Sequence, residues 1–168
     1  PKQFLSWRGR PLFVAGLEPF VGLIETAVVV VPPDRVESSR EEIGELPLSV
    51  TVVAGGRTRQ ESVSRGLDHL GPKIGWVLVH DAVRPFVSRE LILSVFQETV
   101  RTGACVPLLP LRDTVKRVEE GFVRETLDRE RLGLAQTPQG FRMDWLLQAV
   151  QEAEKAGYQG TDESSLLE

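Results

Sequence analysis

The sequence predicts an α/β fold built on a Rossmann-like, mostly parallel sheet with helices on both of its faces. Two observations point to this class: apolar runs rich in β-branched residues recur along the chain, and amphipathic stretches separate them. Strands that are apolar throughout belong to sheets buried on both sides, and the intervening helices supply that cover. The 168 residues are enough for one compact core, so we expect a single domain over residues 1–168.

Four apolar runs are the predicted strands. TAVVVV (26–31) is stopped by Pro32 and Pro33, because proline supplies no N–H to a sheet. The remaining runs are LSVTVVA (48–54), WVLVH (76–80) and ACVPLL (104–109). Their short length, their β-branched content and the turn residues beside them favour strands over buried helix segments.

Amphipathic stretches with apolar residues at helical spacing are the predicted helices. Thr58 and Glu61 stand at the spacing of a capping box, which marks a helix start. Ser88 is the expected N-cap of another helix, and Gly103 is its expected end. The predicted helices span 34–44, 58–70, 88–103 and 143–157.

Residues 112–127 (RDTVKRVEEGFVRETL) differ from the rest, because polar and apolar residues alternate on both sides of Glu120 and Gly121. Alternation around such a turn predicts a β-hairpin. We expect this hairpin to protrude from the core as a β-arm at about residues 111–128. An arm of this kind either packs on another subunit or lies free on the surface, and the residues alone leave both open.

Composition excludes several classes of protein. The net charge of −4 argues against a nucleic-acid-binding face. No apolar run approaches the ~20 residues that span a bilayer, so we expect no membrane helix. Cys105 is the only cysteine, which excludes an internal disulfide, and we expect an ordinary buried thiol. No signal peptide is visible, which favours the cytoplasm.

The two ends of the chain are unusual. The sequence begins at Pro1, its only methionine is Met143, and it stops at Glu168 within an apparent helix. We therefore expect both ends to be trimmed, disordered or missing from the recorded sequence.

Ligands of open parallel sheets bind outside the carboxyl ends of the strands, and two loops lie at such positions. In the first, AGGRTRQES (54–62), Gly55 and Gly56 allow a ligand to approach the backbone, and the following helix offers free N–H groups. The same glycines also suit a plain tight turn. The segment matches neither the P-loop nor the Gly-x-Gly-x-x-Gly fingerprint.

The second loop follows the strand predicted at 76–80. A carboxylate at Asp81 can hold Mg²⁺, and Arg84 can grip a phosphate or a polyol hydroxyl. Alternatively, the two residues form an ion pair that fixes their own loop. Two histidines are too few for a histidine-based metal site, so we expect His80 to form hydrogen bonds at the strand end and His69 to lie on a helix surface.

Eight segments, taken together and in this order, resemble one enzyme family. They are PKQF (1–4), GRPL (9–12), VVVVPP (28–33), GGRTRQESV (55–63), VHDAVRPF (79–86), RDTVKR (112–117), LDRERLGLAQTPQGF (127–141) and TDESSLLE (161–168). The family is that of 2-C-methyl-D-erythritol 4-phosphate cytidylyltransferase, of the non-mevalonate isoprenoid pathway. The resemblance covers essentially the whole chain, and VHDAVRPF and AQTPQGF are its most specific parts.

This resemblance implies a nucleotidyltransferase fold and the transfer of CMP from CTP to the polyol phosphate, with release of pyrophosphate. It implies that Lys2 neutralises charge on the triphosphate and that Asp81 faces the nucleotide and Mg²⁺. The expected catalytic residues are Lys2, Asp81 and Arg129. The residues expected to contact CTP are Gly55, Gly56, Ser62, Asp81 and Ala82.

The resemblance also implies a homodimer that is joined by the β-arm. Arg84 then faces the polyol, while Thr114 and Arg129 come from the other subunit and grip the acceptor phosphate. Thr137, within TPQ, supports the same region.

Some features depart from the family. The strand and Gly-rich loop that it carries ahead of PKQF, with a second catalytic basic residue, are absent from this sequence, and so are the strand and lysine that it carries after TDE. Arg57 stands where an acidic residue is common, and Val83 replaces a commoner alanine. The alternative functions are a ribitol-5-phosphate cytidylyltransferase on the same scaffold and a noncatalytic nucleotide-binding domain.

Overall fold

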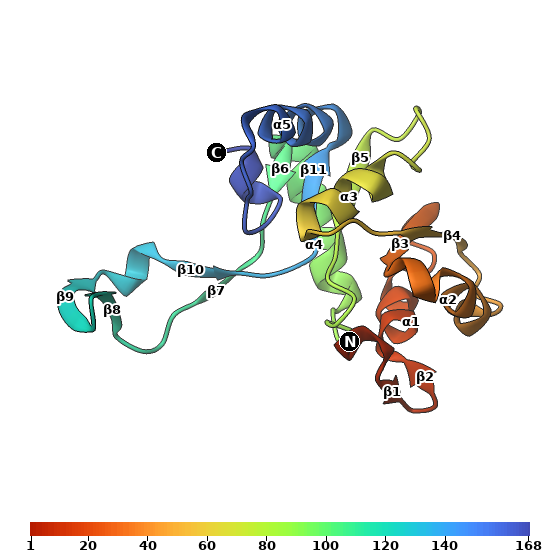
Figure 1. The fold of residues 1–168 in the computed structure, drawn as a ribbon, viewed down its shortest axis with the longest axis horizontal. Helices are drawn as coiled ribbons and strands as arrows, with labels where there is room; N and C mark the ends of the chain where they lie inside the picture. The colour runs from red at the N-terminus through yellow and green to blue at the C-terminus, as the bar shows by residue number, and fades with distance from the viewer.

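The computed structural model describes residues 1–168 and confirms the α/β class (Figure 1). A body of helices and strands carries a long arm that projects away from it (Figure 1). None of the helices combines the length and the apolar composition that crossing a bilayer requires.

Apart from one small hairpin, the strands of the body form two separate pieces of sheet. In one piece, β3 (Thr26–Val31) runs parallel to β4 (Ser49–Ala54) in unbroken register. In the other, β11 (Gln139–Arg142) lies between β5 (Trp76–Val79) and β6 (Ala104–Cys105) and is antiparallel to both. The predicted strands 26–31, 48–54 and 76–80 are therefore confirmed, with ends that agree within one residue.

A groove of about 580 Å³ lies between these two pieces. Apolar side chains line most of it, including Val28 and Val30 from β3 and Val77 and Val79 from β5. Neither β3 nor β5 has a strand partner on the side facing the groove, so the continuous sheet expected from the sequence is interrupted there. Two such edges present free N–H and C=O groups that are suited to pairing with one further strand.

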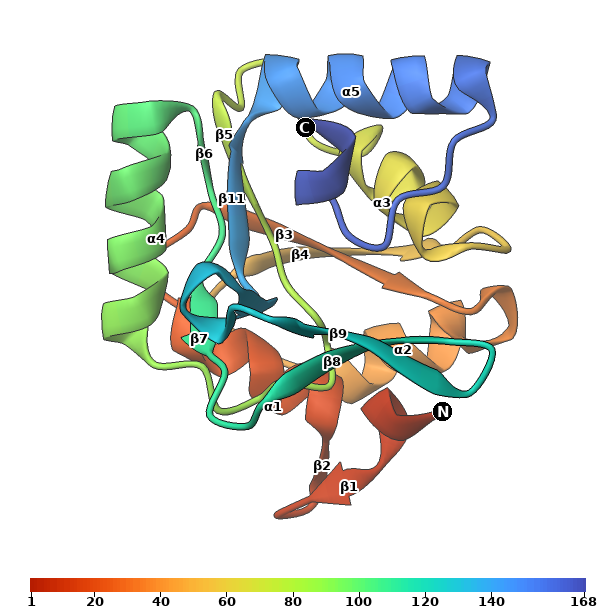
Figure 2. The same cartoon turned by 90° about the vertical axis from the view of Figure 1, so that its left-hand side faces the viewer.

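Three helices cover the piece formed by β5, β11 and β6. Helix α4 (Arg89–Thr102) lies on one side, and α3 (Arg59–Leu67) and α5 (Met143–Ala156) lie on the other (Figure 2). The core on the α3 and α5 side consists of Leu67, Phe141, Met143, Leu146 and Val150. On the opposite side, the close approach of α4 depends on Gly140, because a Cβ at that position would lie 2.0 Å from Oγ1 of Thr99.

The second core belongs to the lobe that contains β3 and β4. Helices α1 (Leu12–Leu17) and α2 (Val36–Ile43) lie in this lobe, together with the small hairpin of β1 (Ser6–Trp7) and β2 (Arg10–Pro11). The buried residues of this core are Phe13, Val14, Val29, Val31 and Val52. Three 3₁₀ turns complete the lobe, at Lys2–Phe4, Glu18–Phe20 and Pro33–Arg35.

The capping residues predicted for α3 and α4 are confirmed, except that one hydrogen bond of the capping box has a different donor. Ser88 accepts a hydrogen bond from the N–H of Leu91, and Gly103 ends α4 in the left-handed conformation. Thr58 likewise accepts from the N–H of Glu61. The Glu61 carboxylate, however, accepts from the N–H of Arg57 at 2.8 Å, so the capping box closes one residue earlier than the spacing predicts.

The segment 104–109 corrects a prediction, because it is not one strand. Its first part is β6 in the sheet, and after Pro107 the chain leaves the body as β7 (Leu108–Pro110), which pairs with β10 (Gly133–Ala135). Proline has no N–H for the sheet, which explains the interruption. The arm is therefore longer than the predicted 111–128, since β7 and β10 form its base.

The tip of the arm is the predicted hairpin. Strand β8 (Val115–Glu119) pairs with β9 (Phe122–Leu127), and a 3₁₀ turn at Arg129–Arg131 leads into β10. Glu120 and Gly121 connect the strands with φ of 52° and 81°. Positive φ at both central residues is the signature of the tight hairpin turn that the Glu-Gly pair predicts. The last ordered turn of the chain is Ser164–Leu166.

Candidate nucleotide site at the ends of β4 and β5

The Gly55–Gly56 loop connects β4 to α3 and is shaped by the first turn of that helix. The N–H of Gly56 donates to Oγ of Ser62 at 3.1 Å, and the Ser62 hydroxyl donates to the C=O of Thr58 at 2.8 Å. A Cβ on Gly55 would lie 2.8 Å from Oγ of Ser62, and one on Gly56 would lie 2.3 Å from Cβ of Glu61. Both positions therefore require glycine, and Ser62 holds the loop in place.

Asp81 follows β5 directly, and its carboxylate contacts two arginines. Nε of Arg84 donates to Oδ2 at 3.1 Å, and Nη2 of Arg59 lies 3.4 Å from Oδ1. The Asp81–Arg84 ion pair, one of the two alternatives that the sequence leaves open, is thus present. The Asp81 side chain remains 31% exposed, so it is accessible to a ligand.

His80 and Thr137 hold the backbone beneath Asp81. The buried hydroxyl of Thr137 accepts from the N–H of Asp81 at 3.2 Å and lies 3.1 Å from Nδ1 of His80. The C=O of Arg84, 3.0 Å from Nε2 of His80, can only accept, so Nε2 carries the proton of the neutral ring. Nδ1 is then an acceptor, and the Thr137 hydroxyl donates its proton to it. His80 is therefore a supporting residue, as expected.

Burial reinforces this assignment of His80. Removal of the ring from water lowers the pKa of His80 below its ordinary value of 6.5, because burial penalises the charged imidazolium. The ring is neutral at pH 7, which is the form that the hydrogen bonds from Thr137 and to Arg84 require. His69, by contrast, is exposed on the surface and contacts only the C=O of Arg65.

The N-terminal segment packs beneath the same loop. Phe4 and Ala82 both pack against the core of the β3–β4 lobe, and the ring of Trp7 meets that of Phe86 edge-on at 5.2 Å. Lys2, two residues before Phe4, is exposed and makes no ion pair within the chain. Its ammonium group is thus accessible from the solvent.

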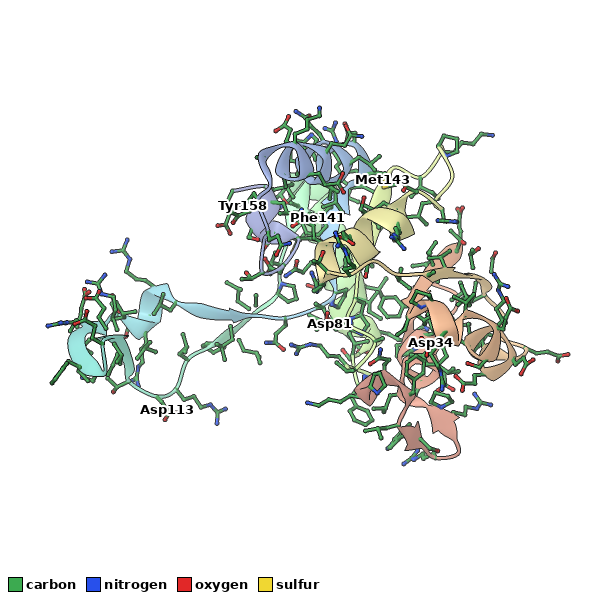
Figure 3. All side chains as sticks on the ribbon, viewed as in Figure 1. Asp34, Asp81, Asp113, Phe141, Met143 and Tyr158 are labelled. Carbon is green, nitrogen blue, oxygen red and sulfur yellow. The ribbon has the colours of Figure 1, made fainter.

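The two residues expected from the other subunit do not join this cluster within one chain. Figure 3 places Asp113, the neighbour of Thr114, on the arm and far from Asp81 on the body. Arg129 belongs to the short turn after β9, and its guanidinium donates to the C=O of Arg112 at 2.5 Å. Thr114 and Arg129 therefore lie close to each other in the fold of the arm, apart from the remaining candidate residues.

The sequence analysis misses two charged residues of the site, Arg59 and Glu163. Arg59 on the first turn of α3 forms an ion pair with Glu163, whose side chain is only 2% exposed, as well as contacting Asp81. The two residues are 104 positions apart, so no local spacing could reveal the pair. The only sequence feature that points to Arg59 and Glu163 is that each lies within a segment shared with the family, GGRTRQESV and TDESSLLE.

Asp81 is an accessible carboxylate at the end of β5. No group of three or more His, Cys, Asp or Glu side chains is arranged to hold a metal ion. Asp81 nevertheless suits Mg²⁺, which is often bound by one or two carboxylates together with the phosphates of a substrate. Arg59 and Ser62 of α3 line the groove between β3 and β5 together with Asp81 and Ala82, so this groove joins the start of α3 to the loop after β5.

Comparisons with known proteins identify the family of the chain. The family model described as 2-C-methyl-D-erythritol 4-phosphate cytidylyltransferase matches residues 1–168. The enzyme of that name from Solibacter usitatus is 45% identical, over 99% of this chain and 72% of its own length. A structure of that enzyme from Thermus thermophilus is 36% identical with a TM-score of 0.82, covering 99% of this chain and 78% of that one. The 4-diphosphocytidyl-2C-methyl-D-erythritol synthase of Anaerococcus prevotii is 27% identical with a TM-score of 0.90, over 98% and 76% of the two chains.

The fold, the paired loops and these likenesses define the class first: the protein is a nucleotidyltransferase. Within that class, the chain belongs to the 2-C-methyl-D-erythritol 4-phosphate cytidylyltransferase family, which confirms the resemblance carried by its motifs.

Proposed function

We propose that the protein transfers CMP from CTP to 2-C-methyl-D-erythritol 4-phosphate and releases pyrophosphate. The observation that carries this proposal is the match of the family model to the whole chain. The position of the VHDAVRPF loop supports it, because this loop follows β5 and its Asp81 and Ala82 line one groove together with Arg59 and Ser62 of α3.

In this reaction an oxygen of the acceptor phosphate attacks the α-phosphorus of CTP. A new P–O bond forms, the bond to the β-phosphate breaks, and pyrophosphate leaves with the electron pair. Because both reactants are anions, the protein's task is to neutralise charge and to align the attack. Lys2 and Arg84 are both exposed, and Arg84 lies on the 81–86 loop; we assign the triphosphate to Lys2 and the polyol to Arg84.

We assign the nucleotide to the loops after β4 and β5. Gly55, Gly56 and Ala82 allow the base and ribose to approach the backbone closely, since none carries more than a methyl group. Ser62 still has acceptor capacity for the base after its internal hydrogen bonds are made. Bound with CTP, Mg²⁺ would be held by Asp81 and the phosphates and would offset negative charge on the triphosphate.

We propose further that the β-arm joins two copies of the chain. Apolar side chains on the arm are exposed to an extent unusual for a monomer, with Phe122 68% exposed and Val123 62% exposed. A second copy covering this surface would also bring Thr114 and Arg129 of one chain to the acceptor phosphate at Asp81 of the other. Introducing a charge with Phe122→Glu should shift the mass measured by sedimentation from dimer to monomer. An unchanged dimer would contradict the role of the arm.

The assay for the main proposal is pyrophosphate release from CTP and Mg²⁺, with each polyol phosphate offered separately. Release with methylerythritol phosphate supports the proposal, and release with ribitol 5-phosphate alone would replace it with the alternative cytidylyltransferase. Tight CTP binding without release from either would indicate a noncatalytic nucleotide-binding domain.

Arg129→Ala provides a more local test. This variant should impair the use of the acceptor and leave CTP binding nearly intact, and an equal loss of both would contradict its place at the acceptor phosphate.

We propose the cytoplasm as the location, because the lone thiol of Cys105 is typical of a reducing compartment. Cys105 is half-buried and not fully buried as predicted. Its partial burial still raises the pKa of the thiol, which keeps it protonated and unreactive.

A further inference from the structure

Arg59 connects the two loops of the site through a single guanidinium group. Its Nη1 donates to Oε1 of Glu163, and its Nη2 lies 3.4 Å from Oδ1 of Asp81. Arg59 itself lies on the first turn of α3, directly after the Gly55–Gly56 loop. The contact therefore links the loop after β4 to the loop after β5.

Glu163 has an unusual environment for a carboxylate. Its side chain is 2% exposed, Arg59 is its only hydrogen-bond partner, and its Oε2 atom is buried without any partner. A buried carboxylate is costly unless it is paired with a cation. Glu163 is consequently bound to Arg59, and it fixes the guanidinium in one position.

This arrangement constrains Asp81 from both sides. Arg84 holds Oδ2 at 3.1 Å, but Arg84 also donates to the side chain of Gln136 and is itself about half exposed. Arg59 holds the opposite oxygen and is anchored in the interior by Glu163. The side chains of Arg59 and Arg84 are similarly exposed, at 40% and 43%, and they differ in that only Arg59 is paired with a buried carboxylate. With Arg59 removed, Asp81 would keep only its contact with Arg84.

We propose that Arg59 is a positioning residue for the transfer reaction: anchored by the buried carboxylate of Glu163, it sets the orientation of the Asp81 carboxylate toward the nucleotide. The inference rests on the proposed function, since it assumes that Asp81 serves bound CTP. The planar fork of arginine contacts two carboxylates at once with fixed geometry, which the single ammonium group of lysine cannot do. The charge of Arg59 alone is thus insufficient for the role.

The test compares Arg59→Lys and Glu163→Gln with matched changes in an exposed pair of the same kind, Arg101 and Glu98 on α4. We expect Arg59→Lys to lower kcat about tenfold to a hundredfold, because small misplacements of a site residue have effects of this size. The KM for the polyol phosphate should change less than about twofold, because Arg59 makes no hydrogen bond to Arg84, Thr114 or Arg129, the residues assigned to the acceptor. Arg101→Lys and Glu98→Gln should leave both constants at the wild-type values.

A double-mutant cycle separates positioning from simple structural support. If Arg59 acts through Asp81, the CTP dissociation constant of the protein with both Arg59→Lys and Asp81→Asn should equal that with Asp81→Asn alone. If the two substitutions instead change the CTP dissociation constant by independent factors that multiply in the double variant, the inference is overturned. It is also overturned if Arg59→Lys leaves kcat at the wild-type value, as expected for Arg101→Lys. Arg59→Lys keeps the positive charge beside Glu163, so the cycle remains decisive even where Glu163→Gln fails to fold.

Failure of the proposed function has a different signature. A wild-type protein that neither binds CTP nor releases pyrophosphate would overturn both conclusions together. A wild-type protein that does both, with Arg59→Lys unimpaired, would overturn only the positioning role of Arg59.

Discussion

The Thr137 hydroxyl holds the start of the Asp81 loop through two hydrogen bonds. It accepts from the N–H of Asp81 at 3.2 Å and donates to Nδ1 of His80 at 3.1 Å, and the side chain is buried. Thr137→Val keeps the shape of the side chain and removes both hydrogen bonds. The loss leaves a backbone donor and a ring acceptor without partners in a largely dry environment.

The expected loss of stability follows from these two contacts. A typical buried hydrogen bond contributes about 1 kcal/mol net, and an unsatisfied group costs about 1–3 kcal/mol, so Thr137→Val should lower the free energy of unfolding by about 2–3 kcal/mol. Urea unfolding measures this value. The KM for CTP should rise as well, because the backbone of Asp81 and Ala82 loses its support.

Thr102→Val is the matched control, since the Thr102 hydroxyl also hydrogen-bonds to the backbone but is exposed at the end of α4. The control should change the free energy of unfolding by less than about 0.5 kcal/mol. A Thr137→Val protein as stable as this control, with an unchanged KM, would refute the reasoning.

Two further predictions concern stability. Gly140→Ala places a Cβ 2.0 Å from Oγ1 of the buried Thr99, so urea unfolding should show a loss of at least about 2 kcal/mol, whereas Gly71→Ala, with open space around it, should be neutral. A neutral Gly140→Ala would contradict the packing of α4 on β11. Because burial lowers the pKa of His80 in the folded state, the unfolded chain binds its proton first as the pH falls. The contribution of His80 to stability is therefore complete above its ordinary pKa of 6.5 and declines as the pH falls toward the folded-state value. Urea unfolding between about pH 7.5 and about pH 5 should show this decline in wild type and in His69→Ala, and a weaker decline in His80→Gln; equal slopes in all three would contradict it.

The sequence predicted those elements that are determined by residues close together in the chain. The strands at 26–31 and 48–54 follow from β-branched runs between turn residues, and the start and end of α4 follow from Ser88 and Gly103. The turn of the arm follows from its Glu-Gly pair. In each case the residues that determine the structure lie within a few positions of one another.

The elements that were missed depend on contacts between distant segments. Strand β11 contains Gln139 and Gly140, which are poor strand formers, yet both are buried because Gln139 donates to Asp162 at 2.7 Å and Gly140 lies against α4. The division of 104–109 depends on β10 as the partner of β7. The pairing of Arg59 with Glu163 likewise appears only once the chain is folded.

In the candidate site, too, the predicted residues divide into those that lie close together in one chain and those that do not. The family resemblance predicted Asp81, Arg84 and Thr137 as site residues. In the fold, Asp81 forms hydrogen bonds with both of the other two. The fold leaves Thr114 and Arg129 on the arm, away from Asp81 (Figure 3). The assignment of all five to one active site therefore requires two chains.

Subunit mixing tests this central claim most directly. Asp81→Ala and Arg129→Ala proteins should each be inactive alone. If each site takes Asp81 from one chain and Arg129 from the other, a mixed dimer contains one intact site, and random exchange should restore about a quarter of wild-type pyrophosphate release. Exchange of subunits without any recovery of activity would contradict a site shared between two chains.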